Sequence, residues 1–280
     1  MTPDQQTLLI DCQDAKGLIH LVTDIIYQHD LNIVLNREFV EHQSQHFFMR
    51  TVIEGAFNPE SLISKLRQAL PENANIRLSS HQNKDVIVMA TKEHHVLGDL
   101  LIRNEFDENR ANIQAVISNH EDLRQFVERF DIPFHVISHE DKDRKVHEKE
   151  ILALLANYKP DYIFLAKYMR IFTPEFIGIY KHQLVNIHHS FLPAFVGAKP
   201  YKQAYDRGVK IIGATAHYVT DDLDEGPIIF QSTTPVDHRY DANEMSQAGR
   251  EIESKVMAEA AKLVLDDKVF IYGNKTVILD

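Results

Sequence analysis

Hydrophobic and polar positions along residues 7–80 follow a pattern that predicts a small α+β unit. Short runs rich in β-branched and aromatic residues predict strands, and apolar positions that recur every three or four residues predict helices. In chain order the predicted elements are strand, helix, strand, strand, helix and strand, over 7–12, 18–29, 32–41, 46–54, 59–70 and 76–78. This βαββαβ order predicts an antiparallel four-stranded sheet with two helices on one face.

A polar break at residues 81–84 precedes a different pattern, in which apolar strands alternate with amphipathic helices. Strands that are apolar throughout are typical of a parallel sheet that is buried on both faces. The first predicted strands are 86–90, 113–118, 134–137 and 162–166, and the helices between them are 95–104, 121–130 and 143–158. Such alternation predicts a doubly wound, mostly parallel sheet whose site lies beyond the carboxyl ends of the strands.

Three more predicted strands begin at Leu184, Ile211 and Pro227, and a long helix over 242–265 and a hairpin over 269–279 follow. The whole pattern predicts an α/β protein with two domains. An α+β domain occupies residues 1–80, residues 81–84 form a linker, and residues 85–280 form the doubly wound domain.

The strand that begins at Leu184 turns polar at its carboxyl end, where Asn186 and His188 stand. Residues two apart on a strand face the same side, so these two side chains point together. An amide and an imidazole side by side offer a donor for an oxyanion and a group for proton transfer. Taken alone, the pair is also compatible with a structural role.

Three separated blocks of sequence carry a resemblance to a known family. In chain order they are LAKYMRIFTP at 165–174, Asn186-x-His188, and His217-x-x-Thr220-x-x-x-Asp224 with Gly226-Pro227 close behind. In these blocks and their spacing the chain resembles the formyltetrahydrofolate-dependent transferases and hydrolases, over essentially all of its 280 residues. The resemblance implies a formyltransferase-type fold for the second domain and a folate substrate.

The resemblance implies that Asn186, His188 and Asp224 are catalytic. Removing a formyl group from a folate nitrogen proceeds through a tetrahedral intermediate, which needs an oxyanion donor and a proton shuttle. Asn186 suits the first role and His188 the second. Asp224 would order a water molecule and favour the charged imidazole.

Other residues are expected to bind the substrate. The resemblance places Met169, Arg170 and Ile171 in the pterin pocket, although a core role for the two apolar residues stays open. His217 is expected to buttress the site and Thr220 to line the cleft. Gly197 lies in a segment expected to form a loop over the cleft, in which Lys199 would meet the glutamate tail of the folate.

The family transfers the formyl group to glycinamide ribonucleotide, to methionyl-tRNA or to water. A ribonucleotide needs a phosphate cradle after the first strand, but residues 91–99 hold no glycine cluster and place Glu93 there, which would repel a phosphate. The resemblance therefore implies a hydrolase that converts 10-formyltetrahydrofolate to formate and tetrahydrofolate, balancing folate pools and supplying formate for purine synthesis. A glycinamide ribonucleotide formyltransferase and an inert folate-binding sensor are the alternatives.

Composition limits the partners. The formal net charge of −11 does not indicate a surface for nucleic acid or for an anionic membrane, and we expect neither partner. Cys12 is the only cysteine, which excludes an intrachain disulfide and suits a reducing cytoplasm. Neighbouring His188 and His189 face opposite sides of a strand, so they do not indicate a metal site, and we expect neither a metal nor a cofactor.

The turn Asp14-x-x-Gly17 after the first strand gives residues 1–80 a resemblance to ACT domains. Such modules commonly pair side by side and bind small effectors at this turn. The resemblance implies a homo-oligomer and an amino-acid effector site that includes Asp14, Gly17 and Asn32. The turn holds Ala15-Lys16 where the family usually has Arg-Pro, so a dimerising module without a ligand remains an alternative.

Overall fold

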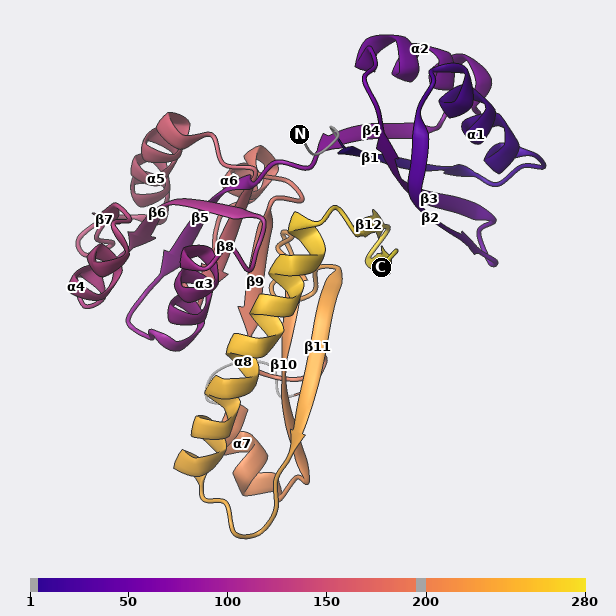
Figure 1. Cartoon of the computed structure of the whole chain (residues 1–280). Coiled ribbons are helices and arrows are strands. Elements are labelled where there is room, and N and C mark those ends of the chain that lie inside the picture. Colours follow the sequence, from indigo (N-terminus) through magenta and orange to yellow (C-terminus); the bar gives the residue numbers. More distant parts are fainter. Residues whose placement is uncertain (1–4, 195–199) are drawn as a thin grey trace. The chain divides into compact units, whose positions relative to one another are not determined.

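The computed structural model describes residues 5–194 and 200–280, which divide into two units (Figure 1). The first unit runs to Gln82 and also contains Asp266–Tyr272 and Val277–Asp280, and the second contains Asn83–Leu265 and Gly273–Thr276. The division between Gln82 and Asn83 falls within the predicted linker. The sequence predicts one domain over 85–280, whereas the structure assigns most of the last fifteen residues to the first unit.

The first unit is a four-stranded antiparallel sheet with the strand order β2-β3-β1-β4, as the βαββαβ pattern predicts. Helices α1 and α2 cover one face of it (Figure 1). The bounds of its elements are β1 Gln5–Gln13, α1 Leu18–Gln28, β2 Asn32–Glu41, β3 His46–Glu54, α2 Pro59–Ala69 and β4 Asn75–Ser80. Local sequence signals fix the start of α2, because the Asn58 side chain accepts from the backbone N–H of Ser61 and proline occupies the first turn.

The other face of this sheet explains where the C-terminal residues lie. Strands β12 (Val269–Tyr272) and β13 (Lys275–Ile278) form a hairpin. From this end of the chain, Phe270 and Leu279 join a buried cluster with Leu9 and Phe48 of the sheet. The rings of Phe48 and Phe270 meet edge to face, with centroids 5.5 Å apart. A sheet with helices on only one face leaves its second apolar face uncovered, and these residues bury it.

The second unit is a seven-stranded sheet with the order β11-β10-β9-β8-β5-β6-β7. Its strands are β5 Lys84–Ala90, β6 Ala111–Ser118, β7 Phe134–Val136, β8 Tyr162–Ala166, β9 Leu184–His188, β10 Ile211–Tyr218 and β11 Ile228–Pro235. The pairings from β9 to β7 are parallel, and β10 is antiparallel to both of its neighbours. The predicted mostly parallel sheet is confirmed.

The helices of the second unit agree with the sequence less closely than the strands do. They are α3 His95–Glu105, α4 Arg124–Val127, α5 Arg144–Tyr158, α6 Pro174–Ile179, α7 Pro200–Arg207 and α8 Ala242–Leu265. The helix predicted over 121–130 is reduced to α4 and one 3-10 turn, Glu128–Phe130. Helices α6 and α7 are not predicted, because both are too short for a clear helical period.

The carboxyl ends of β5, β8 and β9 meet at one edge of the sheet. Ala90 pairs with Ala166, and Leu165 pairs with Asn186, so residues that follow these strands lie near one another. Helix α8 packs against β9, β10 and β11 and against α3 (Figure 1). Among the described residues, no helix is both long and apolar enough to cross a bilayer.

Candidate active site

The antiparallel pairing of β9 with β10 sets His217 directly opposite Asn186. The Asn186 Nδ2 atom lies 3.2 Å from His217 Nε2. The Nδ1 atom of His217 lies 2.9 Å from the carbonyl oxygen of Tyr218, which can only accept a hydrogen bond. Nδ1 must therefore carry a proton, which leaves Nε2 of the neutral ring to accept from the Asn186 amide. A backbone carbonyl thus fixes both the tautomer of His217 and the direction of the amide.

His188 meets Asp224, which comes from the loop after β10. The distance from His188 Nδ1 to Asp224 Oδ2 is 3.2 Å, and the other carboxylate oxygen lies 3.7 Å from His217 Nε2. Both imidazoles are buried. Among the described residues, none provides a hydrogen-bond partner for the buried Nε2 atom of His188. The carboxylate therefore holds one nitrogen of His188 and leaves the other nitrogen for a substrate.

The two histidines also control the charge of Asp224. Burial raises the pKa of its carboxyl, but the hydrogen bond from His188 and the approach of the His217 imidazole outweigh burial and hold the pKa below its ordinary value of 3.8. Asp224 is therefore ionised at neutral pH. A permanent negative charge therefore lies beside the Nδ1 atom of His188.

The loop reaches the strand because of a glycine. A Cβ atom on Gly226 would lie 1.8 Å from the carbonyl oxygen of Tyr218, so no other residue fits there without moving the backbone. Asp224 itself adopts a left-handed backbone conformation, with φ 58°. The Asn274 side chain donates to the carbonyl of Glu225 at 2.8 Å. These constraints hold the carboxylate against the histidines.

The predicted folate-binding segment follows β8 directly. Met169 and Ile171 are 61% and 51% exposed, whereas a core role would bury them. The backbone N–H of Met169 donates to Thr91 at the end of β5, over 3.3 Å. Two exposed apolar side chains on a tethered segment suit a flat heterocycle.

Of the other residues predicted to bind the substrate, Thr220 is described by the structure. Thr220 lies in the β10–β11 loop, where its hydroxyl donates to the carbonyl of Asp222 at 3.2 Å. Gly197 and Lys199 lie outside the described residues.

Comparison with known proteins identifies the family to which the chain belongs. A family model described as formyl transferase matches residues 84–261. The chain is 52% identical over 276 residues to the formyltetrahydrofolate deformylase of Haemophilus influenzae, covering 99% of both chains. The chain belongs to the formyltetrahydrofolate deformylase family.

Solved structures show the same relationship. The crystal structure of a formyltetrahydrofolate deformylase from Pseudomonas syringae pv. tomato is 39% identical, with a TM-score of 0.95 over 100% of this chain and 96% of that one. Glycinamide ribonucleotide transformylase 1 from Symbiobacterium toebii is 26% identical, with a TM-score of 0.69 over 74% of this chain and 98% of that one. The ribonucleotide enzyme is therefore the more distant relative.

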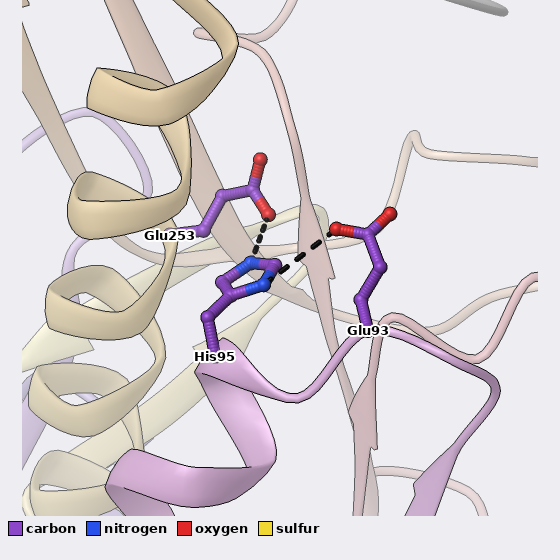
Figure 2. Close-up of side chains that lie close together, drawn as sticks. All are labelled: Glu93, His95 and Glu253. Atoms are coloured by element: carbon purple, nitrogen blue, oxygen red, sulfur yellow. Dashed lines mark hydrogen bonds and ion pairs between the residues drawn. The ribbon is translucent and has the colours of Figure 1, made fainter. Parts of the chain in front are cut away.

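This deformylase-family chain also carries a charged cluster that the sequence analysis does not assign. Figure 2 shows His95, at the start of α3, between the carboxylates of Glu253 and Glu93. Lys167, the residue after β8, lies 3.2 Å from Glu253. A signal for it exists in the sequence, because Glu253 shares the apolar face of α8 with Gly249, Val256 and Ala260.

His189 lies between the two charged groups. Its ring centroid is 5.1 Å from that of His188. Burial, followed by the positive charges of Lys167 and His188, lowers the pKa of His189 from 6.5 to about 4. His189 is therefore neutral at physiological pH, so it adds no positive charge beside His188.

The first unit holds the predicted effector residues. Its first turn borders a depression of about 390 Å³, lined by Asp14, Ala15, Gly17, Leu18, Ile19, Glu38, Phe39, Val40 and Phe47. The structure thus brings Asp14 and Gly17 to one depression. Asn32, at the start of β2, is exposed and is not among the described residues that line it.

The neutral state of His189 predicts a pH dependence of stability. Between pH 6.5 and pH 4 the unfolded chain binds a proton at His189 that the folded chain does not. Stability should therefore fall as the pH drops through this window, by at most about 1.4 kcal/mol per pH unit for one proton, and this loss should be absent above it. His189→Gln should reduce the slope. Urea unfolding at pH 7 and pH 5 measures the free energy of unfolding of the wild type and of His189→Gln. An equal loss of free energy between the two pH values in both proteins would contradict the neutral state of His189.

Proposed function

We propose that this chain hydrolyses 10-formyltetrahydrofolate to formate and tetrahydrofolate, with water as the formyl acceptor. The observation that carries the proposal is the convergence of Asn186, His188 and Asp224 at the carboxyl end of β9, in a chain of the deformylase family.

The positions of the three side chains support a specific division of roles. Water attacks the formyl carbon, and the carbonyl oxygen becomes an oxyanion that the Asn186 amide stabilises. The unpartnered Nε2 of His188 faces the reacting group and delivers a proton to the folate nitrogen as the C–N bond breaks. His188 Nε2 first takes the proton that water loses in the attack and then passes this proton to the folate nitrogen, so the proton count balances.

Asp224 acts through His188 in this proposal. Both of its oxygens face imidazole nitrogens, which supports the prediction that it favours the charged form of His188. A direct role in ordering the attacking water receives less support from this geometry. His217 is proposed as a positioning residue, because it holds the Asn186 amide.

Two features argue against the alternatives. The turn between β5 and α3 has no glycine cluster for a ribonucleotide phosphate and carries Glu93 instead. An inert folate-binding sensor would not need the Asn186, His188 and Asp224 arrangement to be complete.

For the first unit, we propose a homo-oligomer and an amino-acid effector. Strand β2 is an edge of its sheet, and its exposed Val34 and Phe39 offer apolar area for a second copy. The depression at the first turn presents the carboxylates of Asp14 and Glu38, which suit an ammonium group. We propose that the protein is located in the cytoplasm, whose reducing conditions suit the free and buried Cys12.

An assay without any ribonucleotide tests whether water is the formyl acceptor. Purified protein with 10-formyltetrahydrofolate alone should release formate at its full rate, because water is the acceptor. A formate assay with and without glycinamide ribonucleotide measures this. Turnover that begins only when the ribonucleotide is added would contradict hydrolysis.

Substitutions test the catalytic roles. Asp224→Asn should slow single-turnover hydrolysis by about 10²–10⁴, the usual contribution of acid–base assistance. Asn186→Ala should slow it by about 10²–10³, the usual cost of one oxyanion donor. Because the groups act together, the double variant should lose far less than the product of the two.

Folate binding should stay nearly normal in these variants, since the pterin pocket is assigned elsewhere. Asp222→Asn, at an exposed position of the same loop, is the matched control and should keep its rate. A rate within a few-fold of the parent in Asp224→Asn would remove that residue from the mechanism.

The effector site is tested with the intact chain, because deleting residues 1–80 would expose Phe270 and Leu279. Amino acids should alter formate release by the wild type. Asp14→Asn should weaken this response and leave the rate without effector unchanged, whereas Glu72→Gln, exposed in the same unit, should behave as the wild type. No response of the wild type to any of the twenty amino acids would support a ligand-free module.

A further inference from the structure

The charged cluster at the start of α3 is built around one buried carboxylate. Glu253 is 1% exposed, and Lys167, whose side chain is 6% exposed, lies 3.2 Å from it. His95 Nε2 lies 2.8 Å from the same oxygen, and the hydroxyl of Tyr201 donates to the other one. Three donors from three separate segments of the chain therefore converge on one anion.

The local structure constrains two of these donors, Lys167 and Tyr201. Lys167 takes a left-handed conformation, with φ 61°, which is costly for a residue with a side chain. A Cβ atom on Gly249 would lie 2.1 Å from the Tyr201 ring, so this glycine leaves the space in α8 that the ring needs. The constraints aim both donors at Glu253.

The cluster occupies a particular place in the fold. His95 begins α3, the first helix after the first strand of the second unit, and Lys167 follows β8. In doubly wound sheets this first strand-to-helix turn is where a phosphate binds, at the positive end of the helix. Lysine, imidazole and tyrosine hydroxyl are the donors expected around a bound anion. Here the anion is supplied by the chain itself.

The electrostatics agree with this arrangement. Burial raises the pKa of the Glu253 carboxyl, but the hydrogen bond from His95 and the charge of Lys167 outweigh burial and bring the pKa below its ordinary value. Glu93 adds a second carboxylate on the exposed side, 3.6 Å from His95 Nδ1 (Figure 2).

A bound metal ion is a poorer explanation of the cluster. Glu93, His95 and Glu253 do offer ligand atoms within 4.8 Å of one another. The ammonium of Lys167 already supplies the positive charge that Glu253 needs, and it would repel a cation at the same carboxylate.

We propose that Glu253 is a specificity-determining residue whose carboxylate fills the anion site at the first strand-to-helix turn, so that phosphorylated formyl acceptors are excluded and water remains. This inference rests on the proposed hydrolysis and explains its choice of acceptor. A phosphate entering the turn would have to displace a buried, hydrogen-bonded carboxylate and pass Glu93.

The test is whether removing the carboxylate uncovers an anion site. Glu253→Ala removes both charge and volume, so the donors should accept inorganic phosphate in its place. Calorimetry should show phosphate binding at least about tenfold tighter than in the wild type, because charge-assisted hydrogen bonds contribute this much or more to affinity. Glu253→Gln removes the charge but keeps the volume, and should gain no binding.

Two further variants identify the site. Adding Lys167→Met to Glu253→Ala should abolish the acquired binding, and Glu251→Ala, exposed on the same helix, should match the wild type. The inference is overturned if Glu253→Ala binds phosphate no more tightly than the wild type, or if its binding survives the loss of Lys167.

Unfolding and formate release test the anion site and the proposed hydrolysis separately. If Glu253→Ala unfolds in phosphate-free buffer, recovery of its unfolding transition on adding phosphate supports the inference, and no recovery overturns it. Formate release by the wild type is measured in phosphate-free buffer. Absence of formate would remove the proposed hydrolysis, whereas the calorimetric results would still report on the anion site.

Discussion

The pairing of β9 with β10 is the constraint on which the proposed active site depends. Antiparallel register sets His217 opposite Asn186 and Thr215 opposite His188. The Thr215 hydroxyl donates to the carbonyl of Ser190 at 2.9 Å and accepts from the backbone N–H of Leu192, which fixes the turn after β9. Because side chains alternate along a strand, a shift of β10 by one residue would turn His217 and Thr215 to the other face of the sheet.

Charge compensation is the second organising feature of the second unit. The unit holds two ionised carboxylates, Asp224 on the β10–β11 loop and Glu253 on α8, and each lies against nitrogen atoms of neighbouring side chains. A buried charge without such partners would be strongly destabilising. His189 lies between the two groups and is neutral, so it adds no positive charge to either of them. The proposed chemistry and the proposed choice of acceptor therefore depend on adjacent but separate networks.

Much of the architecture could be predicted because it follows from local periodicity. Apolar strands alternating with helices indicate a parallel sheet, and Asn186-x-His188 places two side chains on one face of a strand whatever the tertiary structure. The C-terminal residues could not be assigned in this way. Phe270 and Leu279 look like any strand residues in sequence, and only the uncovered face of the first unit's sheet decides where they pack.

The order of strands and helices and the pairing of Asn186 with His188 on one strand face follow from the sequence, since they depend on residues close together in the chain. The reason for Gly226 became visible only in the structure, where its missing side chain lets the loop approach Tyr218. Which charged groups compensate one another depends on the three-dimensional packing. Lys167 and Glu253 are 86 positions apart by their residue numbers, and neither has a local partner that would reveal the pair. Ion pairs form through space, and the energy that selects them comes from burial, which a linear pattern does not contain.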